Sequence, residues 1–271
     1  MIPSSSGWAT TFLTPMTKAL VPTMGALHGG HLALIDRARE LADEVVVSIF
    51  VNPTQFGAGD DFDRYPRTLD ADRELIADRA EIFVPSIDEV YTPGQPPDAI
   101  DAGARGDMWE GASRSGHFDA VLTVVNRLFD MTQPGIAVFG EKDWQQLALV
   151  RSMAAERHPN IRVVGVPTVR DNDGLAMSSR NRYLSAAERE TAALIPVALN
   201  DIVAEAGSAE SVARARQKLE QSGIDVDYLA VIDPVSLNEV GPNAPARVVI
   251  AARVGATRLI DNMRVRDLPK R

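Results

Sequence analysis

Short apolar runs alternate with amphipathic segments along the first part of the chain. Runs of strand length that are largely apolar predict strands at 18–22, 45–51, 82–84, 135–140 and 161–166. Apolar positions that recur at helical spacing predict helices at 32–42, 68–80, 118–131 and 143–157. Strands that are apolar throughout are typical of a parallel sheet whose two faces are both covered. The alternation therefore predicts an α/β fold built on a doubly wound, Rossmann-like parallel sheet.

The pattern changes in the last third of the chain, where helices come first and strands follow. Ser185-Ala186-Ala187-Glu188 has the form of a capping box and predicts a helix to about Ala206, with a kink or break at Pro196. The remaining periodic segments predict one helix and two strands, at 209–221, 226–232 and 247–254. We therefore expect two domains, a Rossmann-like one over 1–168 and a smaller α+β one over 169–271.

The composition is that of an ordinary globular protein, with 45% hydrophobic and 24% charged residues among 271. A formal net charge of -9 argues against a chain that mainly holds nucleic acid, since phosphate backbones require a surplus of Lys and Arg. The lack of cysteine excludes disulfides and cysteine nucleophiles. No apolar run approaches the ~18 residues of a membrane span, and no signal-peptide pattern opens the chain. We expect a cytoplasmic protein without a membrane partner, in which residues 1–17 form a loose lead-in.

The segment 21–31 combines the end of an apolar run, a glycine-containing turn and the start of a predicted helix. Such an arrangement presents backbone N–H groups and the positive end of a helix, which favour a phosphate. His28 and His31 are three positions apart, so both rings can face one ligand. A zinc pair is the alternative, but zinc requires further ligands, and the other histidines are His117 and His158. We therefore expect the active site at this turn.

Three further groups of polar residues follow predicted strands or occupy a loop, within 52–67, 140–146 and 177–182. The carboxyl ends of parallel strands form the edge of an α/β sheet at which ligands bind. Lys142 and Arg180 can clamp a polyphosphate, since Lys is a point charge and Arg makes bidentate contacts. Gln55 and Gln146 can donate and accept, which suits a substrate with hydroxyl and carboxylate groups. Each residue alone could be a solvated charge or a loop residue, but together they favour one site.

Several longer stretches resemble the pantothenate synthetase (pantoate–β-alanine ligase) family of His-x-Gly-His nucleotidyltransferases. They are VPTMGALH (21–28), FVNPTQF (50–56), YPRTLDAD (65–72), FGEKDWQQ (139–146), GLAMSSRN (174–181) and RLIDN (258–262). The resemblance implies ATP-dependent condensation of pantoate with β-alanine. A pantoyl adenylate would form with release of pyrophosphate, after which the amine of β-alanine would displace AMP. It also implies a homodimer and a C-terminal lid domain that closes over the nucleotide.

The resemblance also assigns roles to individual residues. His31 would be the proton donor, which we expect to act as an imidazolium, while His28 and Lys142 would contact the phosphates. ATP would be bound by Met24, Gly25, Ala26, Leu27, His28, Gly29, Gly30, His31, Gly140, Glu141, Lys142, Asp143, Val169, Met177, Ser178, Ser179 and Arg180. Pantoate and β-alanine would be bound by Gln55, Gln146, Asn52 and Tyr65. Mg²⁺ would accompany the triphosphate, and no protein metal ligand is expected.

The chain departs from the usual family pattern at a few positions. Gly29 stands where the family usually has Glu, and Ser115, Ala120 and Arg127 replace a usual Pro, Gly and Lys. Glycine inside a helix costs ~1 kcal/mol relative to alanine, so we expect Gly29 to loosen the first helical turn. None of these departures removes a residue that is assigned to chemistry.

Three other functions compete with this interpretation. A different His-x-Gly-His adenylyl- or cytidylyltransferase would need a further basic cluster for its phosphate acceptor, where this chain has two glutamines. A nucleotide-binding regulatory protein without activity is opposed by the intact His28, His31, Lys142 and Arg180. A relative of the aminoacyl-tRNA synthetases is opposed by the acidic net charge and the lack of an anticodon-sized extra domain.

Overall fold

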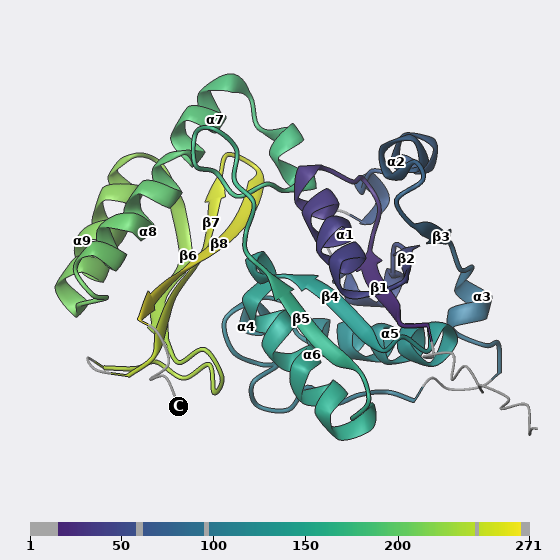
Figure 1. Cartoon of the computed structure of the whole chain (residues 1–271). Helices are drawn as coiled ribbons and strands as arrows, with labels where there is room; N and C mark the ends of the chain where they lie inside the picture. The colour runs from purple at the N-terminus through teal and green to yellow at the C-terminus, as the bar shows by residue number, and fades with distance from the viewer. Residues whose placement is uncertain (1–15, 58–61, 95–97, 242–243, 267–271) are drawn as a thin grey trace, which may run out of the picture.

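The structure is a computed structural model that describes residues 16–57, 62–94, 98–241 and 244–266. Nearly all of the lead-in that we expected over 1–17 lies outside these residues. Within them, no helix is both long and apolar enough to cross a membrane. The chain forms two sheets that lie side by side, each with its own helices (Figure 1).

The first sheet is parallel and has five strands in the order β3-β2-β1-β4-β5. In chain order the strands are β1 (Lys18–Thr23), β2 (Glu44–Ile49), β3 (Glu81–Phe83), β4 (Ile136–Gly140) and β5 (Arg162–Val166). All five were predicted, each within about two residues at either end. The order reverses between β1 and β4, so the α/β, doubly wound prediction is confirmed, and the carboxyl ends of β1 and β4 meet at the switch point where such sheets bind ligands.

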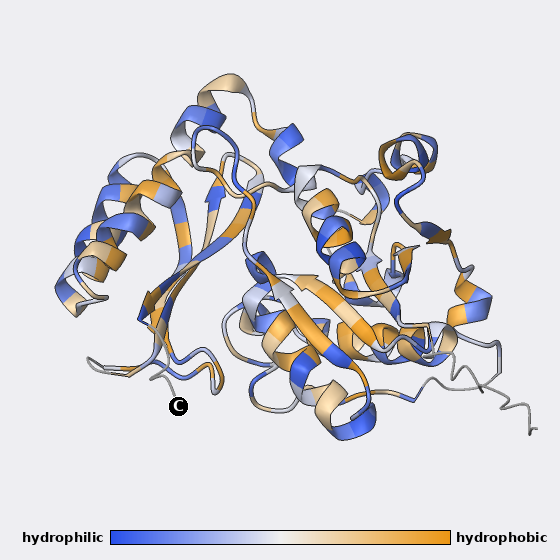
Figure 2. Cartoon of the chain, viewed as in Figure 1, coloured by the Kyte–Doolittle hydropathy of each residue, from blue (hydrophilic) through white to orange (hydrophobic). Residues whose placement is uncertain are grey.

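Helices cover both faces of this sheet (Figure 1). The longer ones are α1 (Gly29–Leu41), α2 (Leu69–Ile76), α5 (His117–Thr132) and α6 (Trp144–Arg157). Successive residues of a strand point to opposite faces. Accordingly Val21 packs in one cluster with Ile35 of α1, whereas Leu20 packs in another with Phe129 of α5. Figure 2 shows β4 between these layers as hydrophobic, which fits burial on both sides.

The second sheet is antiparallel, with the order β6-β7-β8. Its strands are β6 (Asp225–Ile232), β7 (Ala246–Val254) and β8 (Thr257–Arg266), and three helices accompany it, α7 (Ala186–Ala192), α8 (Leu194–Ala204) and α9 (Ala209–Gln221). The smaller α+β unit is thus confirmed, although β8 was not predicted as a strand. The boundary between residues 168 and 169 stays a prediction.

The helix expected from residue 185 to Ala206 is two helices, α7 and α8. The capping box is present, because Ser185 Oγ accepts from the Glu188 N–H and the Glu188 carboxylate accepts from the Ser185 N–H. The break comes at Ala193 rather than at Pro196. A proline ring collides with the carbonyl four residues earlier, here Ala192, so an uninterrupted helix cannot pass this point. Pro196 instead lies in the first turn of α8, where it is tolerated.

The connection between β3 and α5 contains two short helices that were not predicted. These are α3 (Ile87–Val90) and α4 (Glu110–Ser113). Gln145 holds this connection against α6, since its Nε2 donates to the carbonyls of Arg105 and Met108 at 2.8 Å and its Oε1 accepts from the Glu110 N–H. α2 is also shorter than predicted, because Ala77 leaves the helix with φ +50°.

Candidate active site

The turn between β1 and α1 is held by a carboxylate from α2. Asp72 is only 2% exposed, and its two oxygens accept hydrogen bonds from the backbone N–H groups of Ala26 (3.0 Å) and Leu27 (2.8 Å). Ala26 has φ +51° and Gly25 has φ +78°. A Cβ on Gly25 would meet the Asp72 carboxylate at 3.0 Å, so glycine is required here for both its conformation and its size. Two left-handed residues and a buried carboxylate therefore define the path of the turn.

The two histidines cap the first turn of α1. His28 is the N-cap residue, and its Nδ1 accepts from the Gly30 N–H at 3.1 Å. His31 Nδ1 accepts from the His28 N–H at 3.2 Å, and the two ring centroids are 4.2 Å apart. Since each Nδ1 accepts, each ring carries its proton on Nε2. The helix begins at Gly29, the residue that we expected to loosen the first helical turn. Gly29 is thus the first residue of the helix rather than an interior one, and the first turn is formed and capped.

Burial and charge keep both rings neutral in the ligand-free chain. Burial, reinforced by the positive charge of Lys142, lowers the pKa of His28 from 6.5 to about 4. Burial, with His28 and Lys142 as further causes, lowers the pKa of His31 from 6.5 to about 3. The expected imidazolium at His31 is therefore absent from the free protein, because the site already holds a cation and desolvates the ring. Each ring instead offers a neutral Nε2–H donor.

Asn52 and Gln55 follow β2, and the structure separates their roles. Asn52 is buried, and its Oδ1 accepts from Thr54 Oγ1 (2.9 Å) and the Tyr91 hydroxyl (2.8 Å). Its Nδ2 donates to Gln55 Oε1 at 3.3 Å. Gln55 Nε2 in turn lies 3.0 Å from the sulfur of Met24, which brings the β2 loop against the β1 turn. Asn52 thus engages protein atoms and orients the glutamine amide.

A second pair of side chains supports the backbone of Gln55. Its carbonyl oxygen lies 2.8 Å from His117 Nδ1 and 3.1 Å from Arg114 Nη2. Arg114 Nη1 also lies 3.0 Å from His117 Nε2. Because arginine only donates and a carbonyl only accepts, the contacts assign the proton of a neutral His117 ring to Nδ1. Neither Arg114 nor His117 was assigned a role from the sequence.

The turn after β4 carries the predicted lysine. Glu141–Asp143 form a 3-10 helix that leads into α6, and Lys142 Nζ lies 3.8 Å from Asp143 Oδ1. Asp143 occupies the N-cap position of α6, but its side chain makes no capping hydrogen bond. Both adjacent glutamines line the cavity described below, and Gln145 also holds the β3–α5 connection.

The segment 177–180 lies against the other groups. A Cβ on Gly29 would lie 3.1 Å from the Met177 sulfur. Because Gly29 has no side chain, Met177 can pack closely against the start of α1. Tyr65 OH lies 3.5 Å from Ser179 Oγ, and the Arg180 guanidinium lies 5.9 Å from the Tyr65 ring centroid. The predicted Val169 pairs with this segment through its carbonyl, which accepts from the Met177 N–H at 2.9 Å.

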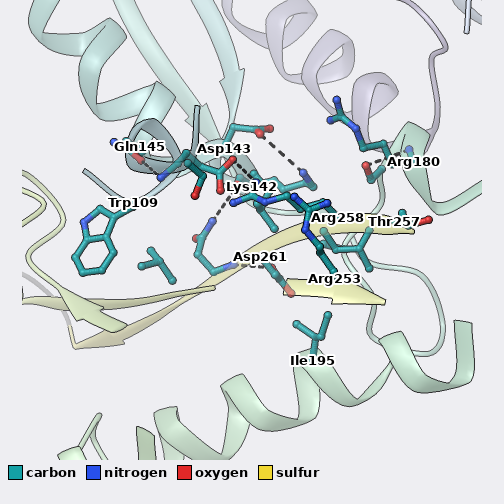
Figure 3. A pocket seen from close by; sticks show the side chains of 18 of the residues that line it. Trp109, Lys142, Asp143, Gln145, Arg180, Ile195, Arg253, Thr257, Arg258 and Asp261 are labelled. Atoms are coloured by element: carbon teal, nitrogen blue, oxygen red, sulfur yellow. Dashed lines mark hydrogen bonds and ion pairs between the residues drawn. The ribbon is translucent and has the colours of Figure 1, made fainter. Parts of the chain in front are cut away.

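A cavity of about 510 Å³ lies between the two sheets. The predicted site residues in its wall are Lys142, Asp143, Gln146, Ser178 and Arg180. Figure 3 shows Lys142 and Asp143 facing the strand that carries Arg258 and Asp261. Some predicted site residues do not line this cavity, namely His28, His31, Met24, Gln55 and Tyr65. They adjoin it through the contacts just described, and the positive charge of Lys142 acts on both histidine rings. All four predicted groups therefore converge at one end of the first sheet.

Asp72 is a residue that sequence reasoning missed, although it lies within the segment 65–72 that carries the family resemblance. Only its place in that segment could have indicated it, because its backbone partners are about 45 positions away in the chain. Across the described ranges, no three Asp, Glu or His side chains are grouped as a metal site.

The chain matches known proteins over most of its length. The sequence profile of the family described as pantoate-beta-alanine ligase matches residues 8–264. A pantothenate synthetase of Leifsonia xyli is 52% identical over 252 residues, which cover 91% of this chain and 88% of the relative. One of Rhizorhabdus wittichii is 49% identical over 259 residues, which cover 93% and 92%.

Solved structures agree with the sequence comparison. A crystal structure of pantothenate synthetase from Thermus thermophilus superimposes with a TM-score of 0.87 at 44% identity, covering 94% of this chain and 95% of that one. A pantoate-beta-alanine ligase of Francisella tularensis, complexed with beta-gamma ATP and beta-alanine, gives 0.80 at 33% identity, with coverage of 96% and 94%. With the motifs gathered at one cavity and both sequence and fold matched along nearly the whole chain, the protein belongs to the pantoate-beta-alanine ligase family and is a ligase.

Proposed function

We propose that this enzyme condenses pantoate with β-alanine at the expense of ATP, through a pantoyl adenylate. The observation that carries the proposal is that Lys142 and Gln146, a cation and an amide one helical turn apart, line one cavity with Ser178 and Arg180. Cations suit the triphosphate, and an amide suits the hydroxyls and carboxylate of the acid. The complex of the Francisella tularensis relative with beta-gamma ATP and beta-alanine supports the same pair of substrates.

ATP would be held at the switch point of the first sheet. The N–H groups of Ala26, Leu27, His28 and Gly30 are already bonded to side chains of the protein, so the expected backbone donors are largely used within the turn. The Nε2–H groups of His28 and His31 remain as donors at the N-terminus of α1, because the capping bonds use Nδ1. Lys142 and Arg180 supply the positive charge from the other side of the cavity. Pantoate would lie between Gln55 and Gln146, with Asn52 orienting Gln55.

The first step forms an acid–phosphate anhydride. A carboxylate oxygen of pantoate attacks the α-phosphorus of ATP, the bond from that phosphorus to the bridging oxygen breaks, and pyrophosphate leaves with the electron pair. No covalent enzyme intermediate is required, so the enzyme contributes alignment and charge stabilisation, and alignment alone can supply ~7–11 kcal/mol. We assign to His31 a hydrogen bond from Nε2 to the developing negative charge, in place of the imidazolium expected from the sequence.

The second step transfers the acyl group. The neutral amine of β-alanine attacks the acyl carbon, the bond between that carbon and the adenylate oxygen breaks, and the amine nitrogen loses a proton as AMP leaves. The products are pantothenate and AMP.

Mg²⁺ would enter with the triphosphate and, when bound, would neutralise part of its charge. No protein ligand for this ion was expected, but Asp143 lines the cavity beside Lys142 and would offer a carboxylate oxygen of the kind this ion prefers. A homodimer, a cytoplasmic location and closure of the C-terminal unit as a lid stay predictions from the family resemblance.

The test is an assay of purified protein in which each substrate is omitted in turn. Pyrophosphate should form from ATP when pantoate is present and β-alanine is absent, in an amount close to one equivalent of enzyme. Multiple turnovers, with AMP and pantothenate in equal amounts, should require all three substrates. Transfer of the nucleotide to a phosphorylated acceptor, without any dependence on pantoate, would instead favour another His-x-Gly-His nucleotidyltransferase.

A further inference from the structure

The segment 258–262 carries part of the family resemblance, yet the chemistry above does not use it. It lies in β8 of the second sheet, and its last residue, Asn262, reaches the first sheet. Asn262 Nδ2 donates to the backbone carbonyls of Glu141 (2.9 Å) and Lys142 (2.7 Å). Asn262 is 3% exposed, so these bonds are shielded from water. A single amide from one sheet therefore holds the turn that carries the cavity lysine of the other.

The orientation of this amide is determined by its neighbours. Asn262 Oδ1 accepts a short hydrogen bond from Arg247 Nη1, which leaves Nδ2 facing the two carbonyls. The other terminal nitrogen of Arg247 forms an ion pair with Glu141 Oε2 at 3.0 Å, and its guanidinium lies 3.6 Å from the ring centroid of Trp144. Arg247 is buried in β7, so the guanidinium cannot move independently of the sheet.

The preceding residue fastens β8 to the other side of the site. Asp261 is buried, and its carboxylate receives two hydrogen bonds from Arg170, at 2.7 and 2.9 Å. Arg170 also pairs with Ala176, immediately before the segment 177–180. Successive residues of β8 thus contact the two segments that contribute Lys142 and Arg180 to the cavity. Figure 3 shows Asp261 on the strand opposite Lys142.

We propose that Asn262 is a positioning residue that holds the backbone of Lys142 so that the ammonium group faces the phosphates of the nucleotide. The inference rests on the proposed function, because it takes Lys142 as a phosphate ligand. A free 3-10 turn leaves its carbonyls to water and allows the lysine several directions. Two buried hydrogen bonds to consecutive carbonyls select one direction for the lysine side chain. The second sheet is therefore necessary to the active site rather than only adjacent to it.

The experiment replaces the amide with its isosteric acid, Asn262→Asp, which places a carboxylate oxygen against two carbonyl oxygens. Displacement of a catalytic group by about 1 Å can cost about 100-fold, so we expect kcat/KM for ATP to fall about 10- to 100-fold in the pyrophosphate-release assay. KM for pantoate should stay close to that of the parent. The control is Asn200→Asp on α8, an exposed residue whose Nδ2 donates to the Pro196 carbonyl, and its kinetics should not change.

A double-mutant cycle with Lys142→Ala distinguishes positioning from general destabilisation. If Asn262 acts through the lysine, the double variant should be no slower than Lys142→Ala alone. Suppose that Lys142→Ala impairs the reaction. The inference is then overturned if the losses in kcat/KM from the two substitutions multiply, or if Asn262→Asp has the kinetics of the parent. If Lys142→Ala itself leaves kcat/KM for ATP unchanged, the proposed role of the lysine fails and the inference falls with it.

Thermal unfolding of each variant shows whether it is folded at the assay temperature. Should Asn262→Asp not fold, Asn262→Ser takes its place, because it removes the amide without adding a charge. The same loss in kcat/KM for ATP and the same lack of additivity with Lys142→Ala are expected. Parent kinetics in a folded Asn262→Ser enzyme would overturn the proposal.

Discussion

His28 and His31 take the places that Ser or Thr and Glu or Gln occupy in the usual capping box. Each ring uses Nδ1 as the acceptor, so capping consumes the acceptor nitrogen and leaves a donor at Nε2. The same residues therefore form the helix end and provide neutral donors beside Lys142. Burial and the nearby charge of Lys142 lower the pKa of both imidazoles, which the spacing of the histidines alone did not indicate.

The neutral histidines predict a pH dependence of stability. Their pKa values are lowered in the fold from 6.5 to about 4 for His28 and about 3 for His31. The unfolded chain thus binds more protons below pH 6.5, so these groups make the protein less stable as pH falls through this range and have no effect above it. The double variant His28→Asn/His31→Gln keeps acceptors for both capping bonds but does not titrate. Between neutral pH and about pH 4, its melting temperature, measured by circular dichroism, should fall less than that of the parent. An equal fall in both proteins would contradict the lowered pKa values of the two histidines.

Gln146 provides a second test at the residue scale. It lines the cavity, as does its neighbour Gln145, but the amide of Gln145 is already bonded to the β3–α5 connection. Gln146→Ala should raise KM for pantoate up to about 10-fold, the value of one or two neutral hydrogen bonds, and change KM for ATP less. Steady-state kinetics measure both, with Gln217→Ala on the exposed face of α9 as the control. A change in KM for ATP alone would show that Gln146 does not bind pantoate.

At the scale of elements, the site is built from turns that other elements hold in place. The β1–α1 turn depends on Asp72 of α2, and the β2 loop depends on Asn52 and on the pair formed by Arg114 and His117. Asn52 bonds the nearby side chain of Gln55, whereas Asp72, Arg114 and His117 bond backbone atoms far away in the chain. The residues that contact substrate can then have single orientations before any ligand arrives, which reduces the cost of ordering them on binding.

Asp72→Asn tests this dependence, because the amide can retain only one of the two acceptor positions. A buried N–H that loses its partner costs ~1–3 kcal/mol, so we expect a loss of that size in the free energy of unfolding, measured in urea. KM for ATP should rise as well, since the turn leads into His28 and His31, which are proposed to bind the phosphates. Asp70→Asn is the matched control on the same helix, with a side chain that is 95% exposed, and it should change neither quantity. Equal behaviour of the two variants would contradict an anchoring role.

At the scale of the whole molecule, the two sheets are joined by apolar packing and by a partly buried cluster of charges. Trp109 and Trp144 pack against residues of β6 and β7, and their indole N–H groups donate to the carbonyls of Leu237 and Pro234. Arg258 of β8 pairs with Glu110 at 2.8 Å and with Asp227 at 2.6 Å. The cavity therefore lies between units that interact through specific contacts, rather than units joined only by a linker.

Removing Arg258 should weaken this junction strongly. Arg258→Met leaves the buried Glu110 carboxylate without its cationic partner, and breaking such a pair costs ~3–5 kcal/mol. Urea denaturation should show a loss of this order in the free energy of unfolding. The comparison is Lys218→Met, which breaks an exposed pair with Asp201 and should cost no more than ~1 kcal/mol. Similar losses in the two variants would show that the junction does not depend on Arg258.

Local patterns were sufficient for much of this molecule. The strands of the first sheet, α9 at Ala209–Gln221 and the capping box at Ser185 follow from periodicity and from side chains that satisfy nearby backbone groups. The four polar groups at strand ends were also recognisable, because parallel strands bring their carboxyl ends to one edge. In each case the cause lies within a few residues along the chain, where a sequence pattern can record it.

Other features depend on residues that only folding brings together. β8 alternates poorly, because Asp261 and Asn262 are buried polar residues, and their burial is compensated by Arg170 and by carbonyls about 120 positions away. The pKa of His31 is lowered mainly by burial, with His28 and Lys142 of the turn after β4 as further causes, and the turn before α1 requires Asp72. Hydrogen bonds and charges act through space and have no period along the chain, so they became visible only once the chain was folded.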